Sequence, residues 1–159
     1  MNLVVGATGL LGGEICRLLS AKGKPVRALV RPTADKARIE KLRSLGVELV
    51  QGDLKDRPSL DGACRGVTTV ISTAATTISR QPGDTIQKVE QEGQISLIDA
   101  ARAAAVSHFI YISYSGNIKF DDPLTTAKRT VEQHVQRSGL VYTILRPSMF
   151  MEIWLSPAV

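Results

Sequence analysis

A glycine-rich segment directly after the first apolar run limits how this chain can fold more than any other feature. It reads GATGLLGG over residues 6–13 and separates the apolar run 3–5 from an amphipathic stretch. In such a turn, the first glycine permits a sharp reversal, the second lets backbone amides approach a pyrophosphate, and the third lets helix and strand pack closely. The amino end of the helix adds N–H groups and a partial positive charge. The segment therefore predicts a strand, a turn and a helix that bind a dinucleotide. The alternative, that these are merely flexible glycines in a turn, explains their spacing less well.

Short apolar runs alternate with longer amphipathic stretches, which is typical of strand–helix–strand units around a parallel sheet. The predicted strands are 3–5, 26–30, 47–50, 67–71, 109–112 and 141–145. The predicted helices are 9–22, 34–45, 57–64, 84–105 and 124–138. We therefore expect an α/β fold, a Rossmann-like doubly wound parallel sheet of about six strands with helices on both faces.

The fourth predicted helix shows the helical period clearly. One face of the stretch 86–104 is apolar or small, whereas Lys88, Glu92 and Arg102 lie elsewhere. A continuous amphipathic helix of this kind packs its apolar face on the sheet. No linker, repeat or low-complexity tract interrupts the pattern, so we expect residues 1–159 to form one NAD(P)-binding domain.

Composition narrows the class of protein. Hydrophobic residues make up 43% of the chain, yet no apolar run approaches the roughly 20 residues that a membrane span needs. The amino terminus has no signal-peptide pattern, which predicts a cytoplasmic protein. The net charge of +5 arises from basic residues interspersed with acidic ones. This distribution favours a small anionic ligand over nucleic acid.

The cysteines and histidines are few and scattered. Cys16 and Cys64 belong to no CxxC pair, and His108 and His134 stand apart from each other. Metal-binding motifs need such residues at short, regular spacing. The sequence therefore predicts buried thiols and no metal site.

The residue after the second predicted strand selects between NAD and NADP. An NAD-specific site usually has an acidic side chain about 20 residues after the glycine turn, where it binds the free 2'-hydroxyl. Arg31 stands there instead, and its guanidinium suits a 2'-phosphate. Lys36 and Arg38 lie nearby, although a solvated helix surface is the simpler interpretation for both. The sequence therefore predicts NADP(H) in preference to NAD(H).

Seven segments in a fixed order resemble the NmrA-like family, a group of atypical short-chain dehydrogenase/reductase relatives. They are GATGLLGG, VRALVRP, VELVQGDL, EGQISLIDAA, FIYIS, the lysine of TTAKRTVEQ, and YTILRPSMFME. Together they extend over essentially the whole chain. The resemblance implies a dinucleotide-binding fold and indicates which positions contact the cofactor.

The family pattern implies an adenine contact at the GD pair, a ribose contact at the end of the fourth strand, and a nicotinamide contact after the sixth. The corresponding residues here are Asp53 with Leu54, Thr73 with Ala74, and Pro147 with Ser148. With the glycine turn, Arg31 and the family's lysine, the predicted cofactor-binding residues are Gly6, Thr8, Gly9, Leu10, Leu11, Gly12, Arg31, Asp53, Leu54, Thr73, Ala74, Lys128, Pro147 and Ser148.

The catalytic positions match the superfamily pattern only in part. That pattern has a proton-transferring tyrosine four residues before a lysine that holds the nicotinamide ribose. Lys128 matches the lysine, but Leu124 stands at the tyrosine position and cannot transfer a proton. Ser113 matches the superfamily's serine and can hydrogen-bond a carbonyl substrate, whereas the neighbouring Tyr114 is an alternative acid for which a packing role is more usual. The predicted catalytic residues are Lys128 and Ser113.

The carboxyl-terminal stretch departs from the family in length. NmrA-like chains continue past the RPSMFME segment into a substrate lobe, whereas this sequence stops at Val159. The stretch 149–155 is apolar and includes Trp154, and exposed apolar segments tend to mark interfaces or missing structure. We therefore expect a substrate lobe that is largely missing, and either a fragment or a chain completed by oligomerisation through this segment.

Three functions of different classes fit these observations. The first is an NADPH-dependent oxidoreductase of a small carbonyl or quinone-type substrate. The second is a non-catalytic NADP(H)-sensing regulator of an unknown protein partner, and the third is an assembly or chaperone-like factor, as for the photosystem-associated members of the family. Leu124 favours the last two, whereas Arg31, Lys128 and Ser113 favour the first. We rank the reductase first for the family and do not expect this chain alone to turn over substrate.

Overall fold

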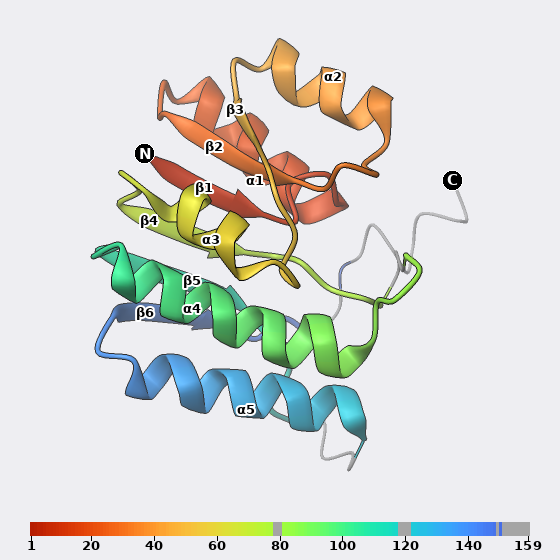
Figure 1. Ribbon diagram of the computed structural model, residues 1–159, viewed down its shortest axis with the longest axis vertical. Helices are drawn as coiled ribbons and strands as arrows, with labels where there is room; N and C mark the ends of the chain where they lie inside the picture. The colour runs from red at the N-terminus through yellow and green to blue at the C-terminus, as the bar shows by residue number, and fades with distance from the viewer. Residues whose placement is uncertain (78–80, 118–121, 149, 151–159) are drawn as a thin grey trace.

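The strands of this protein form one sheet. The computed structural model describes residues 1–77, 81–117, 122–148 and 150, and within them all neighbouring strands pair in parallel in the order β3-β2-β1-β4-β5-β6 (Figure 1). The strands are β1 (Asn2–Val5), β2 (Val26–Val30), β3 (Glu48–Gln51), β4 (Thr69–Ser72), β5 (His108–Ile112) and β6 (Val141–Leu145). The predicted six-stranded α/β fold is confirmed.

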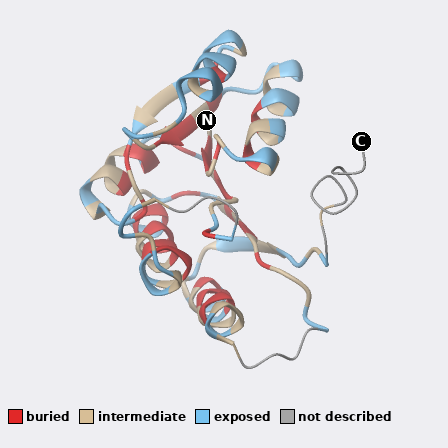
Figure 2. Ribbon diagram, turned by 90° about the vertical axis from the view of Figure 1, so that its right-hand side faces the viewer, coloured by how far each residue is buried: buried red, intermediate tan, exposed pale blue. Residues whose placement is uncertain are grey.

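Helices cover both faces of the sheet, as the sequence predicts. They are α1 (Leu10–Ala21), α2 (Lys36–Ser44), α3 (Arg57–Cys64), η1 (Ile86–Gly93) continuing into α4 (Gln94–Ala103), and α5 (Pro123–Arg137). The core is split accordingly into a cluster that joins the sheet to α1 and α2 and a larger one that joins it to α3, α4 and α5. Figure 2 shows the buried residues in the strands and on the inner sides of these helices. None of the described helices is long and apolar enough to cross a bilayer.

The strand order reverses next to β1. The chain runs outward from β1 through β2 to β3, then returns past β1 to β4 and continues outward to β6. The carboxyl ends of β1 and β4 therefore lie side by side while the connections after them diverge to opposite faces. Ligands of open parallel sheets bind at such a switch point.

The fourth helix differs from the continuous α-helix that periodicity predicts for residues 84–105. Its first half, η1, is a π-helix, and only its second half, α4, is an α-helix. Gly93 lies against Leu54 so closely that an added Cβ would be 2.8 Å from the Leu54 Cβ. Two buried polar residues, Glu90 in η1 and Gln94 at the start of α4, hydrogen-bond the loop after β4. Apolar periodicity does not reveal this change, because the residues concerned are polar or lack a side chain.

The outer edge at β6 is more exposed than the middle of the sheet. The side chains of Val141 and Leu145 lie on the same face as Ile110, and the two residues are 68% and 49% exposed. On the opposite face, Ile144 packs against the larger core cluster. Helix α5 therefore covers one face of β6, whereas the other face is open over the described residues.

Candidate functional site

The glycine turn after β1 is held against the end of β4. Gly6 has φ +88°, and an added Cβ would be 2.7 Å from both the Ala74 backbone nitrogen and the Thr73 Oγ1. Gly12 has no room for a side chain either, since an added Cβ would be 2.7 Å from the Gly6 carbonyl carbon. Thr73 Oγ1 donates to the Val5 carbonyl oxygen at 3.0 Å. The predicted requirement for glycine at these two positions is confirmed by the geometry.

The amino end of α1 is open for an anion. Gly9 is the N-cap residue, no side chain caps the helix, and the first turn holds no acidic residue. The Gly9 N–H donates to the Gly6 carbonyl oxygen at 2.9 Å, which orients the turn ahead of the helix. Leu10 is 58% exposed at the first helical position. Backbone N–H groups and the helix dipole favour negative charge there, so this end of α1 meets the needs of a pyrophosphate.

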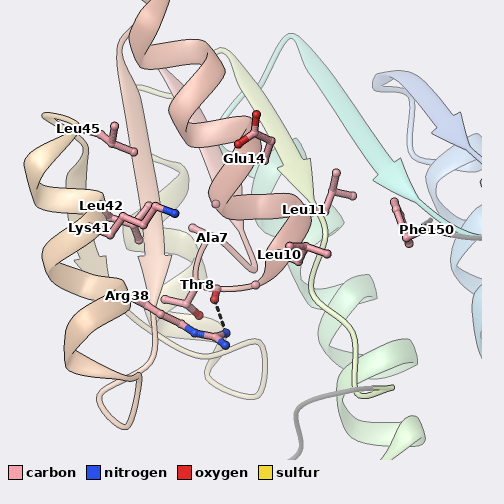
Figure 3. A pocket seen from close by; sticks show the side chains of 12 residues that line it. Ala7, Thr8, Leu10, Leu11, Glu14, Arg38, Lys41, Leu42, Leu45 and Phe150 are labelled. Carbon is pink, nitrogen blue, oxygen red and sulfur yellow. Dashed lines mark hydrogen bonds between the residues drawn. The ribbon is translucent and has the colours of Figure 1, made fainter. Parts of the chain in front are cut away.

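A cavity of about 520 Å³ surrounds this helix end (Figure 3). Its lining residues come from the glycine turn and α1, from α2, and from the segment after β6, and they are Ala7, Thr8, Gly9, Leu10, Leu11, Gly13, Glu14, Arg38, Lys41, Leu42, Leu45 and Phe150. In Figure 3 the Arg38 guanidinium reaches the glycine turn, and its Nη1 donates to the Thr8 carbonyl oxygen at 2.7 Å. Arg38 is an exposed residue of α2, as the sequence favours, and its guanidinium nevertheless contacts the glycine turn.

Arg31 lies where the sequence predicts, at the end of β2, but it has an acidic partner. Its Nη1 is 2.8 Å from Asp84 Oδ2, and Lys55 pairs with the other oxygen of the same carboxylate. The Asp84 side chain is only 1% exposed. Burial alone would raise the pKa of this carboxyl, but hydrogen bonds from Lys55, the Gln81 backbone N–H and Arg31 outweigh it and lower the pKa below its ordinary value. Asp84 is therefore ionised at neutral pH.

The GD pair at the end of β3 joins this charged group. Asp53 Oδ1 accepts the Lys55 backbone N–H at 2.9 Å, and the Lys55 Nζ is 3.8 Å from Asp53 Oδ2. Leu54 is buried against Gly93 of η1. Two cations and two carboxylates thus meet at the carboxyl ends of β2 and β3, where the resemblance implies the adenosine half of a dinucleotide.

Lys128 is buried in an ion pair that the sequence did not predict. Its Nζ is 2.9 Å from Glu90 Oε2, and the two side chains are 7% and 0% exposed. The ammonium also donates to the Ile112 carbonyl oxygen at 3.4 Å and lies 5.2 Å from the centre of the Tyr111 ring. The other Glu90 oxygen accepts the Thr76 N–H at 2.6 Å. Glu90 therefore links α5 to the loop after β4 and fixes the position of Lys128.

Ser113 faces a second buried carboxylate. The Ser113 Oγ is 3.4 Å from Arg129 Nη1, and Arg129 pairs with Glu132. Arg146 donates to both Glu132 oxygens, at 3.0 and 2.6 Å. Burial would raise the pKa of Glu132, but hydrogen bonds from Arg146 and Ser113 and the Arg129 charge outweigh it and lower the pKa. The structure thus places Ser113 and Lys128 at the same end of β5 but beside different partners.

The alternative acid, Tyr114, has a satisfied hydroxyl. It hydrogen-bonds Thr125, which in turn donates to Asp122, the residue that caps α5. The Asp122 carboxylate also accepts the backbone N–H of Leu124 at 2.9 Å. The packing role that the sequence favours for Tyr114 is consistent with these contacts, and the tyrosine position of the superfamily lies in the first turn of α5.

The segment after β6 also contacts the segment after β5. The Pro147 carbonyl oxygen accepts the Ser115 N–H at 2.9 Å, so the segments after β5 and β6 run together, and Ser148 beyond them is exposed. Residue 149 and residues 151–159, which include Trp154, lie outside the described residues.

The predicted positions therefore lie at the carboxyl ends of the strands. The sequence did not identify the charged residues that pair with them. The glycine turn, Thr73 and Ala74 meet at the switch point, and the other predicted groups follow the ends of the outer strands. The missed residues are Lys55, Asp84, Glu90 and Glu132. Each pairs with a residue of another element, and no local sequence pattern signals such pairs.

Comparisons with known proteins agree with this geometry. A photosystem II assembly factor, Ycf39, from Trieres chinensis is 35% identical over 94% of this chain and 46% of its own length. An NAD(P)H azoreductase from Xenophilus azovorans is 34% identical over 96% of this chain and 49% of its own. The chain thus spans about half the length of these curated relatives.

Solved structures share the fold. The NADPH-dependent quinone oxidoreductase QOR2 from Escherichia coli, solved with NADPH, superposes with a TM-score of 0.78 and 27% identity, covering 99% of this chain and 52% of that one. The family model of the NmrA-like family matches residues 2–159. This protein belongs to the NmrA-like family.

Proposed function

We propose that residues 1–159 form the cofactor-binding domain of an NADPH-dependent oxidoreductase that acts on a small carbonyl or quinone-type substrate. The observation that carries the proposal is the glycine turn, whose Gly6 and Gly12 leave no room for a Cβ beside an uncapped α1. That combination suits a pyrophosphate. The E. coli neighbour, whose name describes an NADPH-dependent quinone oxidoreductase, supports the substrate class.

In this proposal each end of the cofactor has its own group of residues. Gly9, Leu10 and Leu11 offer backbone N–H groups to the pyrophosphate, and Thr73 with Ala74 forms the wall behind the turn. Asp53 and Leu54 bind the adenosine half, whereas Pro147 and Ser148 lie toward the nicotinamide half.

The preference for NADP(H) rests on two arginines. Arg31 lies at the end of β2, and Arg38 donates to the Thr8 carbonyl oxygen beside the glycine turn. A 2'-phosphate placed between these guanidinium groups gains charge-assisted hydrogen bonds that a 2'-hydroxyl does not. Arg38 thus supports a preference that the sequence ascribes to Arg31.

The chemical step uses few groups of this chain. The nicotinamide supplies the hydride when the cofactor is bound. Ser113 hydrogen-bonds the substrate carbonyl, and Lys128 binds the nicotinamide ribose from its place beside Glu90. Leu124 offers no proton at the position where the superfamily has tyrosine, so the proton has to come from solvent or substrate. We therefore expect slow or absent turnover by this chain together with firm cofactor binding.

A second function, a non-catalytic NADP(H)-responsive regulator or assembly factor, is favoured by one specific observation. The Lys128 ammonium is neutralised by Glu90 and almost completely buried, which suits a structural element better than a proton-transfer group. The Trieres chinensis relative is named as a photosystem II assembly factor. In this alternative, cofactor binding controls a protein partner and no substrate is reduced.

Two glycine variants test the cofactor site. Gly9→Ala places a methyl group on the open end of α1, with its Cβ 3.2 Å from the Gly6 carbonyl oxygen, and should weaken NADPH binding at least about tenfold. Gly62→Ala in α3 is the matched control, because no atom lies within 4 Å of its Cβ, and it should bind NADPH like the unmutated chain. Isothermal titration calorimetry measures both. Equal affinities for all three proteins would remove the glycine turn from the site.

Turnover separates the two functions. NADPH oxidation against a panel of quinones and enones, measured on the chain that binds NADPH, should be slow and should fall further in Ser113→Ala. Oxidation of any of these substrates that falls in Ser113→Ala would favour the reductase over the regulator or assembly factor, whereas binding without oxidation is compatible with both functions. Fast oxidation that survives both Ser113→Ala and Lys128→Ala would exclude the roles assigned to these two residues.

A further inference from the structure

The buried carboxylate of Asp84 lies at the end of the sheet where the adenosine half of the cofactor is proposed to bind. Its side chain is 1% exposed, and three donors surround it: the Arg31 guanidinium at 2.8 Å, the Gln81 backbone N–H at 3.0 Å, and the Lys55 ammonium. Both cations come from the ends of strands, Arg31 after β2 and Lys55 after β3. The ionised carboxylate therefore occupies a position with the hydrogen-bond donors and positive charges of an anion-binding site.

A short turn over residues 81–84 places Asp84 between these donors. The Asp84 N–H donates to the Gln81 carbonyl oxygen at 2.9 Å, and Gly83 within the turn has φ +83°. The Gln81 side chain accepts a hydrogen bond from the Thr33 hydroxyl, so the turn is fastened to the loop between β2 and α2. The turn therefore lies over the Arg31 loop, although it precedes η1 in the sequence.

We propose that Asp84 competes with the 2'-phosphate of NADP(H) for Arg31 and Lys55, and thereby limits the preference for NADPH over NADH. This inference rests on the proposed function. Arg31, Lys55, Asp53 and Asp84 carry two positive and two negative charges, so the group is already neutral. A 2'-phosphate adds close to two further negative charges, and it gains the Arg31 contact fully only when Asp84 withdraws. NADH, with a 2'-hydroxyl, meets no such competition.

A competing Asp84 and a supporting Asp84 predict opposite changes in NADPH affinity when the Asp84 charge is removed. If Asp84 served to aim Arg31 at the phosphate, removing its charge would loosen Arg31 and weaken NADPH binding. If Asp84 competes, removing its charge frees Arg31 and strengthens NADPH binding. The NADH affinity should stay nearly constant in the second case, because a 2'-hydroxyl binds without displacing the Asp84 carboxylate.

The test compares Asp84→Asn with the unmutated chain by calorimetric titration of NADPH and NADH. Asp61→Asn is the matched control, because Asp61 forms an ion pair with Arg57 on α3 that is far more exposed than that of Asp84. Adenosine 2',5'-bisphosphate and 5'-AMP repeat the comparison with the adenosine half alone, so the result does not depend on the nicotinamide end. Circular dichroism verifies that each variant is folded.

We expect Asp84→Asn to bind NADPH and adenosine 2',5'-bisphosphate at least about fivefold more tightly, with less than about twofold change for NADH and 5'-AMP. Should Asp84→Asn not fold, Gln81→Ala loosens the same turn without changing any charge and should shift the affinities in the same direction. Unchanged or weaker NADPH binding in the folded variant overturns the competition while leaving the proposed function intact. A chain that binds neither dinucleotide overturns both.

Discussion

At the scale of single residues, buried charge pairs decide what the predicted side chains can do. The sequence identifies Arg31 from its position after a strand, and the family resemblance identifies Lys128. It does not identify Asp84 or Glu90, because each lies far along the chain from its partner and belongs to another element. The basic side chains of the site were therefore predictable, whereas the carboxylates that pair with them were not.

The pair of Lys128 and Glu90 should contribute to stability as a unit. Removing one partner leaves a buried charge unpaired, so Glu90→Gln and Lys128→Met should each lower the free energy of unfolding by about 3 to 5 kcal/mol. The double variant should lose clearly less than the sum of both changes, because neither charge is then left alone. Urea unfolding followed by circular dichroism measures all three.

A matched control comes from an exposed pair. Glu40 and Arg43 on α2 form an ion pair with side chains that are 66% and 62% exposed, so Glu40→Gln should hardly change the unfolding midpoint. Additive effects of the Glu90 and Lys128 substitutions would mean that the two side chains do not stabilise each other in solution.

At the scale of elements, the sequence predicts most helices and strands but not the form of the fourth helix. The prediction for 57–64 coincides with α3, and the strands 26–30 and 141–145 coincide with β2 and β6. These elements have short apolar runs or clear ends. The π-helix η1 was not predictable from apolar spacing, because two of its buried residues, Gly93 against Leu54 and Glu90, lack a side chain or are polar.

Gly93 should be the most sensitive point of η1. An added Cβ would lie 2.8 Å from Leu54 Cβ and 3.0 Å from the Lys88 carbonyl oxygen, so Gly93→Ala should destabilise the fold by about 1 to 3 kcal/mol. Gly62→Ala in α3 has open space around the same methyl group and should be neutral or stabilising by up to about 1 kcal/mol. Thermal unfolding of both variants checks the contrast, and equal melting temperatures would show that η1 adapts without strain.

At the scale of the whole molecule, the strand order explains why distant segments form one site. The glycine turn follows β1, Thr73 follows β4, and these two strands are neighbours although many residues separate them in sequence. The alternation of strands and helices predicts a parallel sheet, and the position of the glycine turn predicts its ligand-binding edge. The chain spans about half the length of its curated relatives, so the substrate and protein partners remain proposals.

The central claim is that a dinucleotide binds at the glycine turn, and amide chemical shifts test it most directly. In a nitrogen-15 correlation spectrum of the chain titrated with NADPH, the backbone amides of Thr8, Gly9, Leu10 and Leu11 should shift most. The amide of Gly23, beyond the opposite end of α1, should stay nearly fixed. Saturable shifts at the glycine turn and at the carboxyl ends of the strands that carry the other proposed cofactor contacts are the predicted result. Shifts that spare residues 8–11 at saturating NADPH would contradict the account.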